Sequence, residues 1–222
     1  MLNLPRSKEG IPYISYSQYR SWNDPKSFHL GVKGKYEYML DYFFDEDFPD
    51  MGWAQFGEEV EGYICQRSFS EAFSPEEKKV LETIEPLGLF QHEFFLRFDG
   101  FGLLGFIDDA KEDFSHIRDY KTCSKSSSKK YYKDDYYQLD IYAMWVQQNF
   151  GHLPETLEVM MIERTGNPFK GGGRSVLKVG EQVWSHYRET SQERINFLRE
   201  DIRRTAEEIA VTWEVFQKML KL

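Results

Sequence analysis

Two predicted strands, joined by a short turn, carry the residues of this chain best suited to chemistry. Residues 103–108 are apolar and end in an acid, and residues 115–121 have the pattern of a returning strand. The stretch between them, residues 109–113, is short and polar, as a hairpin connection should be. The sequence therefore predicts a hairpin with charged side chains near the end of its strands.

The charged side chains of this hairpin could hold a divalent metal ion against a phosphodiester. Side chains two apart on a strand share a face, so Asp119 and Lys121 should point the same way, and pairing of the strands would bring Asp108 alongside. Two carboxylates that close repel each other, and Mg²⁺ offsets that repulsion because it takes carboxylate, water and phosphate oxygens. Lys121 would then contact the attacking water or the scissile phosphate as a compact point charge. For an isolated Asp-x-Lys pattern, the alternative is a solvent-facing hairpin with scattered charges.

A helix that follows the hairpin adds two polar side chains on one face. It is predicted over residues 136–149, because Asp134 and Asp135 suit its positive end and a glycine at 151 can cap its other end. Gln138 and Tyr142 are four residues apart and so lie on the same side of the helix. The other reading of this segment is an amphipathic helix whose apolar residues fill the core.

The order and spacing of these motifs resemble the PD-(D/E)xK nuclease superfamily, in its RecB-type exonuclease branch. The resemblance covers roughly residues 11–165. It includes residues 14–19, which look like the opening helix of that branch, and residues 56–61, where the branch carries a metal ligand. Such a resemblance implies an α/β fold, with a central mixed β-sheet flanked by helices around a restriction-endonuclease-like nuclease core.

The resemblance also implies additional metal ligands. Glu61 matches the family's ligand position on the helix before the sheet, with Glu58, one helical turn away, as its rival. The Tyr120 carbonyl would complete the shell formed by Glu61 and the two aspartates. Glu93 matches a glutamate that family members often carry on the preceding strand, although it could equally be an ordinary strand acid.

By the same resemblance, the chain is a Mg²⁺- or Mn²⁺-dependent phosphodiesterase. Gln138 would orient Lys121 or the phosphate, and Tyr142 would support the helix face or contact the strand. An exonuclease acting on linear single- or double-stranded DNA is favoured, in replication, recombination or repair, because no extra recognition element of a site-specific cutter is evident. The small size resembles viral and mobile-element exonucleases. The cysteines, Cys65 and Cys123, are too few for the iron–sulfur cluster of some members of the branch.

Two other functions remain open at this stage. One is a catalytically silent nuclease-like subunit that binds DNA ends or a partner protein. The other is an RNA or branched-DNA nuclease of the same superfamily. A homo-oligomer, or a replication or recombination partner, is compatible with either function.

The length of the chain predicts a single domain, which the resemblance implies is a nuclease domain. The 222 residues suffice for one compact core. They are expected to form a helical N-terminal part (1–90), a catalytic sheet and helix (91–165), and a C-terminal hairpin and helix (166–222). The absence of a long apolar run or a leader pattern predicts no membrane association and a cytoplasmic location, in the host cytoplasm if the protein is viral.

The net charge of −9 is unfavourable for binding to phosphates, but the basic residues are unevenly distributed. A serine-rich segment after the second strand, residues 122–133, is predicted to be a mobile loop that contacts the DNA backbone through Lys125, Lys129, Lys130 and Lys133. Neighbouring tyrosines could stack on unpaired bases; they are Tyr131, Tyr132, Tyr136 and Tyr137. A solvated connection and core tyrosines are the alternatives.

Overall fold

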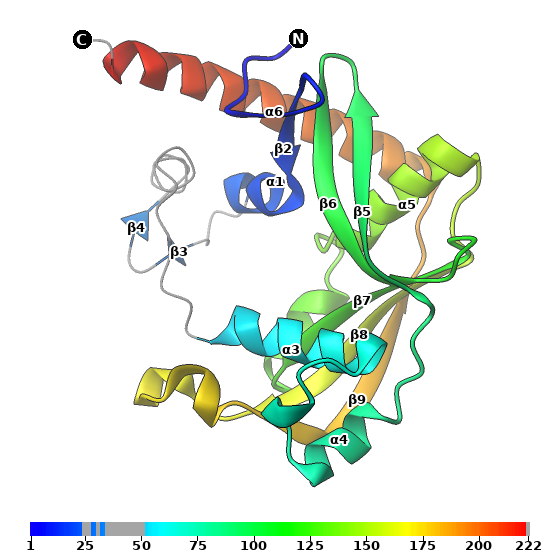
Figure 1. Ribbon diagram of the computed structural model, residues 1–222. Coiled ribbons are helices and arrows are strands. Elements are labelled where there is room, and N and C mark those ends of the chain that lie inside the picture. The colour runs from blue at the N-terminus through cyan, green and yellow to red at the C-terminus, as the bar shows by residue number, and fades with distance from the viewer. Residues whose placement is uncertain (24–27, 30–31, 34–51, 221–222) are drawn as a thin grey trace. The chain divides into compact units, whose positions relative to one another are not determined.

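The computed structural model describes residues 1–23, 28–29, 32–33 and 52–220 (Figure 1). The chain divides into two compact units. The first consists of residues 1–48, 93–105 and 191–222, and the second of residues 49–92 and 106–190. Two strands, β5 (Leu89–Phe98) and β6 (Phe101–Ala110), contribute residues to both units. The single domain expected from the sequence stays a prediction.

The first unit begins with two short strands, β1 (Arg6–Lys8) and β2 (Ile11–Ser15). They pair antiparallel, and β2 continues the ladder parallel to β6, with Tyr13 opposite Gly102. The expectation of a helical N-terminal part is wrong for these residues. Burial in β2 alternates, with Pro12 and Ile14 inside, which is the period of a strand with one buried face.

The opening helix expected from the sequence is α1 (Tyr16–Asn23). It packs on α6 (Gln192–Leu220), where Tyr19 Oη donates to Asp201 at 2.7 Å and Trp22 Nε1 donates to Glu208 at 2.8 Å. The expected C-terminal helix is confirmed, and its apolar side chains are buried as far as Ala210. A short antiparallel pair, β3 (Phe28–His29) and β4 (Val32–Lys33), follows α1. Residues 24–27, 30–31 and 34–51 lie outside the described part of the chain.

The second unit contains the sheet that carries the predicted hairpin. From β6 it continues through β7 (His116–Cys123), β8 (Thr156–Thr165) and β9 (Lys178–Arg188). Strand β7 is antiparallel to β6 and parallel to β8, and β9 is antiparallel to β8. The pairings give a seven-stranded mixed sheet in the order β1-β2-β6-β7-β8-β9, with β5 beside β6. The two strands of the predicted hairpin, 103–108 and 115–121, are confirmed to within a few residues by β6 and β7.

Helices cover both faces of this part of the sheet. On one face lie α3 (Trp53–Gln66) and α4 (Pro75–Leu81), which begins with the predicted Ser74 cap. Phe56, Val60 and Ile64 repeat every four residues and so form one side of α3, which packs on Tyr120 of β7. Burying this side of α3 against the sheet fixes the position of the acids on the helix.

The opposite face of β7 is directed toward α5 (Gln138–Phe150), which contacts that strand. The helix starts two residues later than predicted, because neither aspartate before it caps it and Tyr137 occupies the N-cap. It ends as predicted at Gly151, whose φ of 78° is the left-handed conformation that glycine adopts without strain. None of the described helices is long and apolar enough to cross a bilayer.

Four short 3-10 helices complete the second unit. They are η1 (Ser70–Ala72), η2 (Ser127–Tyr132), η3 (Pro168–Lys170) and η4 (Gly173–Val176). The first precedes α4, the second links β7 to α5, and the last two lie in the turn-rich segment between β8 and β9. Only η2 bears on the site described below.

Candidate active site

The predicted acids and lysine come together where β6 and β7 meet. The ladder between these strands pairs Asp109 with Arg118, so Asp108 and Asp119 are the next residues on each strand and face each other. Lys121 Nζ donates to Asp119 Oδ1 at 2.7 Å and lies 3.9 Å from Asp108 Oδ2. The structure thus brings Asp108, Asp119 and Lys121 into one group, and Asp119 and Lys121 share a face as expected.

This group is almost closed off from solvent. Asp108 is 8% exposed and Asp119 is 0% exposed. Burial, and then the charge of Asp119, raise the pKa of Asp108 well above its ordinary value. Burial alone would lower the pKa of Lys121, but the charges of Asp119 and Asp108 outweigh it and raise that pKa. The two neighbouring acids therefore keep Lys121 protonated.

Backbone groups of β7 also face this gap. The Tyr120 N–H donates to Asp108 Oδ2 at 2.9 Å. The N–H and C=O of one strand residue point to the same edge of the strand, so the Tyr120 carbonyl faces the β6 side as well. That is the position in which the carbonyl could serve as the predicted ligand.

Glu61 approaches the group from α3. Its Oε2 accepts from Gln91 Nε2 at 3.0 Å. Its pKa is raised to about 7, first by burial and also by the charge of Asp119, while Lys121 acts in the opposite direction. Its rival Glu58 is exposed one turn earlier on the same helix. Of these two acids, Glu61 is the one in electrostatic contact with the group on β7.

A chain of hydrogen bonds connects α5 to Asp119. Gln138 Nε2 donates to the Tyr142 hydroxyl at 2.5 Å, and that hydroxyl donates to the Phe106 carbonyl at 2.8 Å. At the other end, Tyr136 Oη lies 2.9 Å from Gln138 Oε1 and 2.7 Å from Asp119 Oδ2. Gln138 and Tyr142 thus lie on one face, as predicted, and the link from Gln138 to the acids passes through Tyr136.

Tyr136 is the residue of this site that the sequence did not single out. It is one of four tyrosines in the segment 131–137, and their pattern does not distinguish them. In the structure Tyr136 is 5% exposed and holds the second oxygen of Asp119, the first being held by Lys121. No sequence signal marks it, because its role depends on how α5 packs against β7.

The oxygen ligands around the acidic group suit a divalent metal ion. Hard oxygen donors are available from Asp108, Asp119 and the Tyr120 carbonyl, with Glu61 close enough to feel their charge. Among the described residues, no three acidic, His or Cys side chains gather tightly enough to hold an ion by themselves. Such a set fits Mg²⁺, which usually takes one or two carboxylates and completes its shell with water and substrate phosphate. The observation that favours a cation here is that two buried acids, Asp108 and Asp119, face each other across β6 and β7.

Glu93 lies on β5 in the first unit, and its side chain pairs with Lys8. That pair is surface-exposed and is the kind of contact that an ordinary strand acid makes. Its assignment as a ligand stays a prediction.

The basic segment after β7 differs from the expected irregular loop. Thr122 and Cys123 still belong to β7, and residues 127–132 form η2. Serine side chains stabilise this turn: the Ser127 hydroxyl accepts from the Ser124 N–H at 3.0 Å, and the Ser128 hydroxyl donates to the Lys125 carbonyl at 2.9 Å. All four predicted substrate-binding lysines are exposed along it; they are Lys125, Lys129, Lys130 and Lys133. Serines were read as breaking regular structure, whereas here they close a turn.

A second buried charged cluster lies on the opposite face of the sheet. Glu158 accepts from Arg118 Nε at 2.8 Å, lies 2.9 Å from His116 Nε2 and is bonded by the Ser185 hydroxyl. Burial alone would raise the pKa of Glu158, but these partners lower it to about 2. The cluster joins β7, β8 and β9, because Glu158 is contacted by His116, Arg118 and Ser185.

Asp109 also lies on this opposite face. It was expected in the polar turn but is fully buried in β6, where it accepts from the Leu87 N–H at 2.9 Å and from the Tyr120 hydroxyl at 2.8 Å. From the sequence alone, two adjacent aspartates do not show which of the two side chains points into the core.

Comparisons with known proteins bear on the family and the fold of this chain. The family model described as the PD-(D/E)XK nuclease superfamily matches residues 39–217. A crystal structure from Eubacterium rectale named “Putative exonuclease” aligns with a TM-score of 0.52 and 16% identity, over 89% of this chain and 82% of that chain. Comparison with curated proteins gave no match. At such low identity the crystal structure supports the fold alone, whereas the family model covers most of the chain. The chain belongs to the PD-(D/E)XK nuclease superfamily.

Proposed function

We propose that this nuclease is a divalent-metal-dependent deoxyribonuclease of the RecB-type branch, which digests linear DNA from an end. The observation that carries the proposal is the buried group of Asp108, Asp119 and Lys121. Burying two neighbouring acids costs folding free energy, even with a lysine between them. Ionisable groups whose pKa values are shifted by burial and by one another are typical of active sites.

Asp108, Asp119 and the Tyr120 carbonyl would hold the metal ion, with Glu61 as the further ligand. When bound there, Mg²⁺ or Mn²⁺ supplies Lewis acidity toward the phosphate and lowers the pKa of a coordinated water. A cation at this place would offset the repulsion between the two neighbouring carboxylates. Their burial limits competition from bulk water for the same oxygens.

Lys121 supplies the fixed positive charge of the site. It stays protonated because its two acidic neighbours raise its pKa. An ammonium group here can donate to the attacking water or to a phosphate oxygen, and it offsets the negative charge that grows on the phosphate in the transition state. Tyr136 holds the Asp119 carboxylate in position through its hydroxyl, and Gln138, which donates to Tyr142, lies beside that hydroxyl.

DNA is favoured over other substrates through the resemblance to the RecB-type branch, and end-directed digestion through the absence of a site-specific recognition element in the sequence. The name of the Eubacterium rectale protein is consistent with an exonuclease. A silent, binding-only relative would have no need of both aspartates and the lysine together.

The test is digestion of end-labelled substrates in Mg²⁺ or Mn²⁺. Linear duplex DNA, linear single strands, covalently closed circles and RNA are compared side by side, with Asp108→Asn as the inactive control. The proposal predicts release of short products from linear DNA, and no loss of circles. Cleavage of circles at the same rate as linear DNA would contradict an end-directed enzyme, and cleavage of RNA alone would contradict a deoxyribonuclease.

A further inference from the structure

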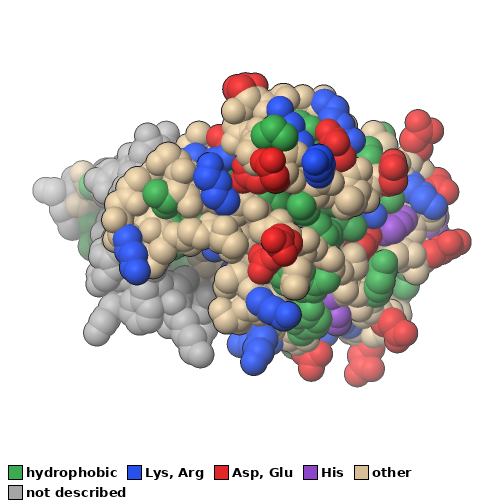
Figure 2. Space-filling model, turned by 90° about the horizontal axis from the view of Figure 1, so that it is seen from below, with side chains coloured by type: hydrophobic (Ala, Val, Ile, Leu, Met, Phe, Trp, Pro, Cys, Tyr) green, Lys and Arg blue, Asp and Glu red, His purple; other side chains and the backbone are tan. Residues whose placement is uncertain are grey.

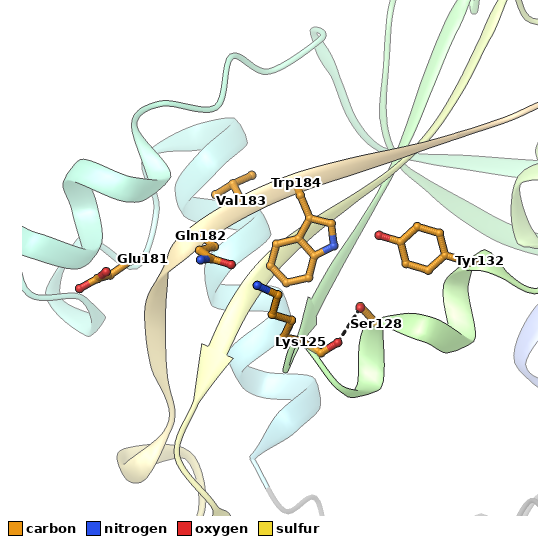
Figure 3. Close-up of a pocket in the computed structure, with 7 residues that line it drawn as sticks. All are labelled: Lys125, Ser128, Tyr132, Glu181, Gln182, Val183 and Trp184. Carbon is orange, nitrogen blue, oxygen red and sulfur yellow. Dashed lines mark hydrogen bonds between the residues drawn. The ribbon is translucent and has the colours of Figure 1, made fainter.

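A surface pocket of about 550 Å³ opens between η2 and β9 in the second unit (Figure 3). One wall carries Lys125, Ser128 and Tyr132, and the other carries Gln182 and Trp184. In Figure 3 the indole of Trp184 and the ring of Tyr132 line the same hollow, and the Lys125 side chain reaches toward the indole. None of these pocket-lining residues belongs to the group of Asp108, Asp119 and Lys121.

Strand register places the pocket on the same face of the sheet as the acidic group. Lys121 of β7 pairs with Met161 of β8, which pairs with Trp184 of β9. Side chains at paired positions point to the same face, so Trp184 and Lys121 project in one direction from strands two apart. Adjacent strands are about 4.8 Å apart, which puts the two backbones about 10 Å from each other.

The row of paired residues that contains Asp119 has the same geometry. Asp119 pairs with Val159, and Val159 pairs with His186. The Tyr132 ring lies 4.4 Å from the His186 ring, measured between centroids. Trp184 thus lies in the row of Lys121, and His186, which contacts Tyr132, lies in the row of Asp119. In both rows, one strand, β8, separates the aromatic residue from the predicted catalytic residue.

The chemistry of the pocket combines flat aromatic surface with a positive charge. Tyr132 is 44% exposed, although the nearby Tyr131 and Tyr136 are each only 5% exposed. Of these three tyrosines, it is therefore the one that can stack on a ligand. Lys125 is exposed beside it, and Lys129 lies on the same turn. Aromatic rings that stack on bases, combined with lysines that follow the backbone, are how proteins hold unpaired nucleic acid.

The wall that carries Lys125 is held in place before any ligand binds. The Ser128 hydroxyl donates to the Lys125 carbonyl, and Ser124 and Ser127 bond to each other across the start of η2. Arg188 NH1 donates to the Lys133 carbonyl at 2.8 Å, which ties the end of the turn to β9. A preformed pocket loses less free energy to ordering when it binds than a mobile loop would.

We propose that this pocket takes an unpaired base of the substrate strand, with Trp184 and Tyr132 as stacking surfaces and Lys125 on an adjacent phosphate. The proposal rests on the proposed nuclease function and specifies its substrate: a strand that is single-stranded within a few nucleotides of the acidic group. A separation of about 10 Å corresponds to roughly three stacked nucleotides. Gln182, two residues before Trp184 and on the same face of β9, offers an acceptor and a donor to the edge of the base.

The test measures binding without turnover, in the Asp119→Asn background, so that a failed nuclease assay does not affect it. Affinities for a fluorescent single-stranded oligonucleotide and for a blunt duplex of equal length are compared for Trp184→Ala and Tyr132→Ala. Each change should weaken single-strand binding by about 5- to 140-fold, the range of one lost stacked base, and weaken blunt-duplex binding much less. Tyr187→Ala is the matched control: Tyr187 is 63% exposed on the same strand but pairs with Glu158 and faces the other side of the sheet.

A second measurement covers the case in which the alanine variants fold poorly. Binding of oligo(dT) should quench tryptophan fluorescence, and Trp184→Phe should remove most of that quenching while keeping near-normal affinity. The chain has five tryptophans, so the remaining four report on folding. Unchanged single-strand affinity in both alanine variants, or equal loss for the blunt duplex, would overturn the pocket proposal. A wild-type protein that binds single strands through this pocket but cleaves nothing would overturn the nuclease proposal and leave the pocket standing.

Discussion

The hydroxyl of Tyr136 supports a residue-scale account of how Asp119 is positioned. Its single hydrogen lies within reach of Asp119 Oδ2 and of Gln138 Oε1, and an ionised carboxylate is the stronger acceptor. Asp119 is therefore held on one oxygen by Lys121 and on the other by Tyr136. Both bonds are buried, so removing either leaves an acceptor without its donor.

Tyr136→Phe should therefore lower turnover while leaving the fold intact. A buried hydrogen bond to a charged group is worth about 1.5–3 kcal/mol, which predicts a loss of roughly 10- to 150-fold at saturating substrate. Tyr187→Phe, which removes an exposed hydroxyl on the other side of the sheet, is the control and should keep full turnover. Turnover of Tyr136→Phe within twofold of the wild type, with an unchanged circular dichroism spectrum, would mean that Tyr136 plays no part in positioning.

Asp108 is expected to reduce stability while it supports activity. Burial first, and Asp119 second, raise its pKa above the ordinary 3.8, so ionisation is less favourable in the folded chain than in the unfolded chain. In the metal-free protein, stability should fall as the pH rises through 3.8 toward the raised value. Asp108→Asn removes that loss and keeps an oxygen for the Tyr120 N–H.

In the presence of a chelator at pH 8, Asp108→Asn should thus melt at a higher temperature than the wild type, by about 2–4 °C for each kcal/mol recovered. The difference should shrink at pH 4, where more of the wild-type carboxyl is protonated. Activity in Mg²⁺ should fall by at least about 100-fold. Thermal unfolding at both pH values checks the account, and a lower melting temperature at pH 8 would show that Asp108 stabilises the fold.

At the scale of elements, Glu158 joins three strands of the sheet behind the active site. Its pKa is lowered from 4.5 to about 2 by His116, Ser185 and Arg118, which overcome the effect of burial. A lowered pKa means stability that is fully present above pH 4.5 and is lost as the pH falls toward 2. The shift corresponds to about 3 kcal/mol.

Glu158→Gln should accordingly destabilise the protein by about 3 kcal/mol at pH 7, and by progressively less below pH 4.5. Denaturant midpoints measured at pH 7 and pH 4 test this, with the exposed Glu155→Gln as the control that should change neither. Equal destabilisation at both pH values would mean that packing, and not the charge of Glu158, holds β7, β8 and β9 together.

The elements that carry the site were predictable because each has a strong local signal. In the strands β5 to β8 and the helix α3, apolar residues recur with the period of the element. The start of α4 is marked by Ser74 as the N-cap and Pro75 at the first helical position. The strands β1 and β2 were missed because three- and five-residue strands are too short to show a period. Tyr136, Asp109 and Trp184 were not identified, because their roles come from the pairing and packing of distant segments, which local sequence does not encode.

At the scale of the whole molecule, a net charge of −9 must be reconciled with a polyanionic substrate. On the face shown in Figure 2, basic side chains are interspersed with acidic and hydrophobic ones and do not form one broad patch. Binding must then depend on local groups of cations. The exposed lysines of η2 and its flanks form such a group, four residues beyond Lys121.

Changing Lys125, Lys129 and Lys130 together to serine should weaken DNA binding and flatten its dependence on salt. Up to three phosphate contacts would be lost, each worth a slope of roughly 0.9 on duplex DNA or 0.7 on single strands. Turnover at saturating DNA should change little, because these groups contact substrate and not the transition state. The exposed pair Lys79 and Lys111, changed to serine, is the control. An unchanged slope in the triple variant would place the DNA-binding surface elsewhere.

The central claim is that Asp108, Asp119 and Lys121 form a metal-dependent centre for phosphodiester hydrolysis. The most direct test is hydrolysis of end-labelled linear DNA by the wild type and by Asp119→Asn, each with Mg²⁺ and with excess chelator. We predict activity only for the wild type with Mg²⁺, with Asp119→Asn reduced by about 100- to 1000-fold or more while its circular dichroism spectrum is unchanged. Full hydrolysis by Asp119→Asn, or by the wild type in excess chelator, would contradict the account.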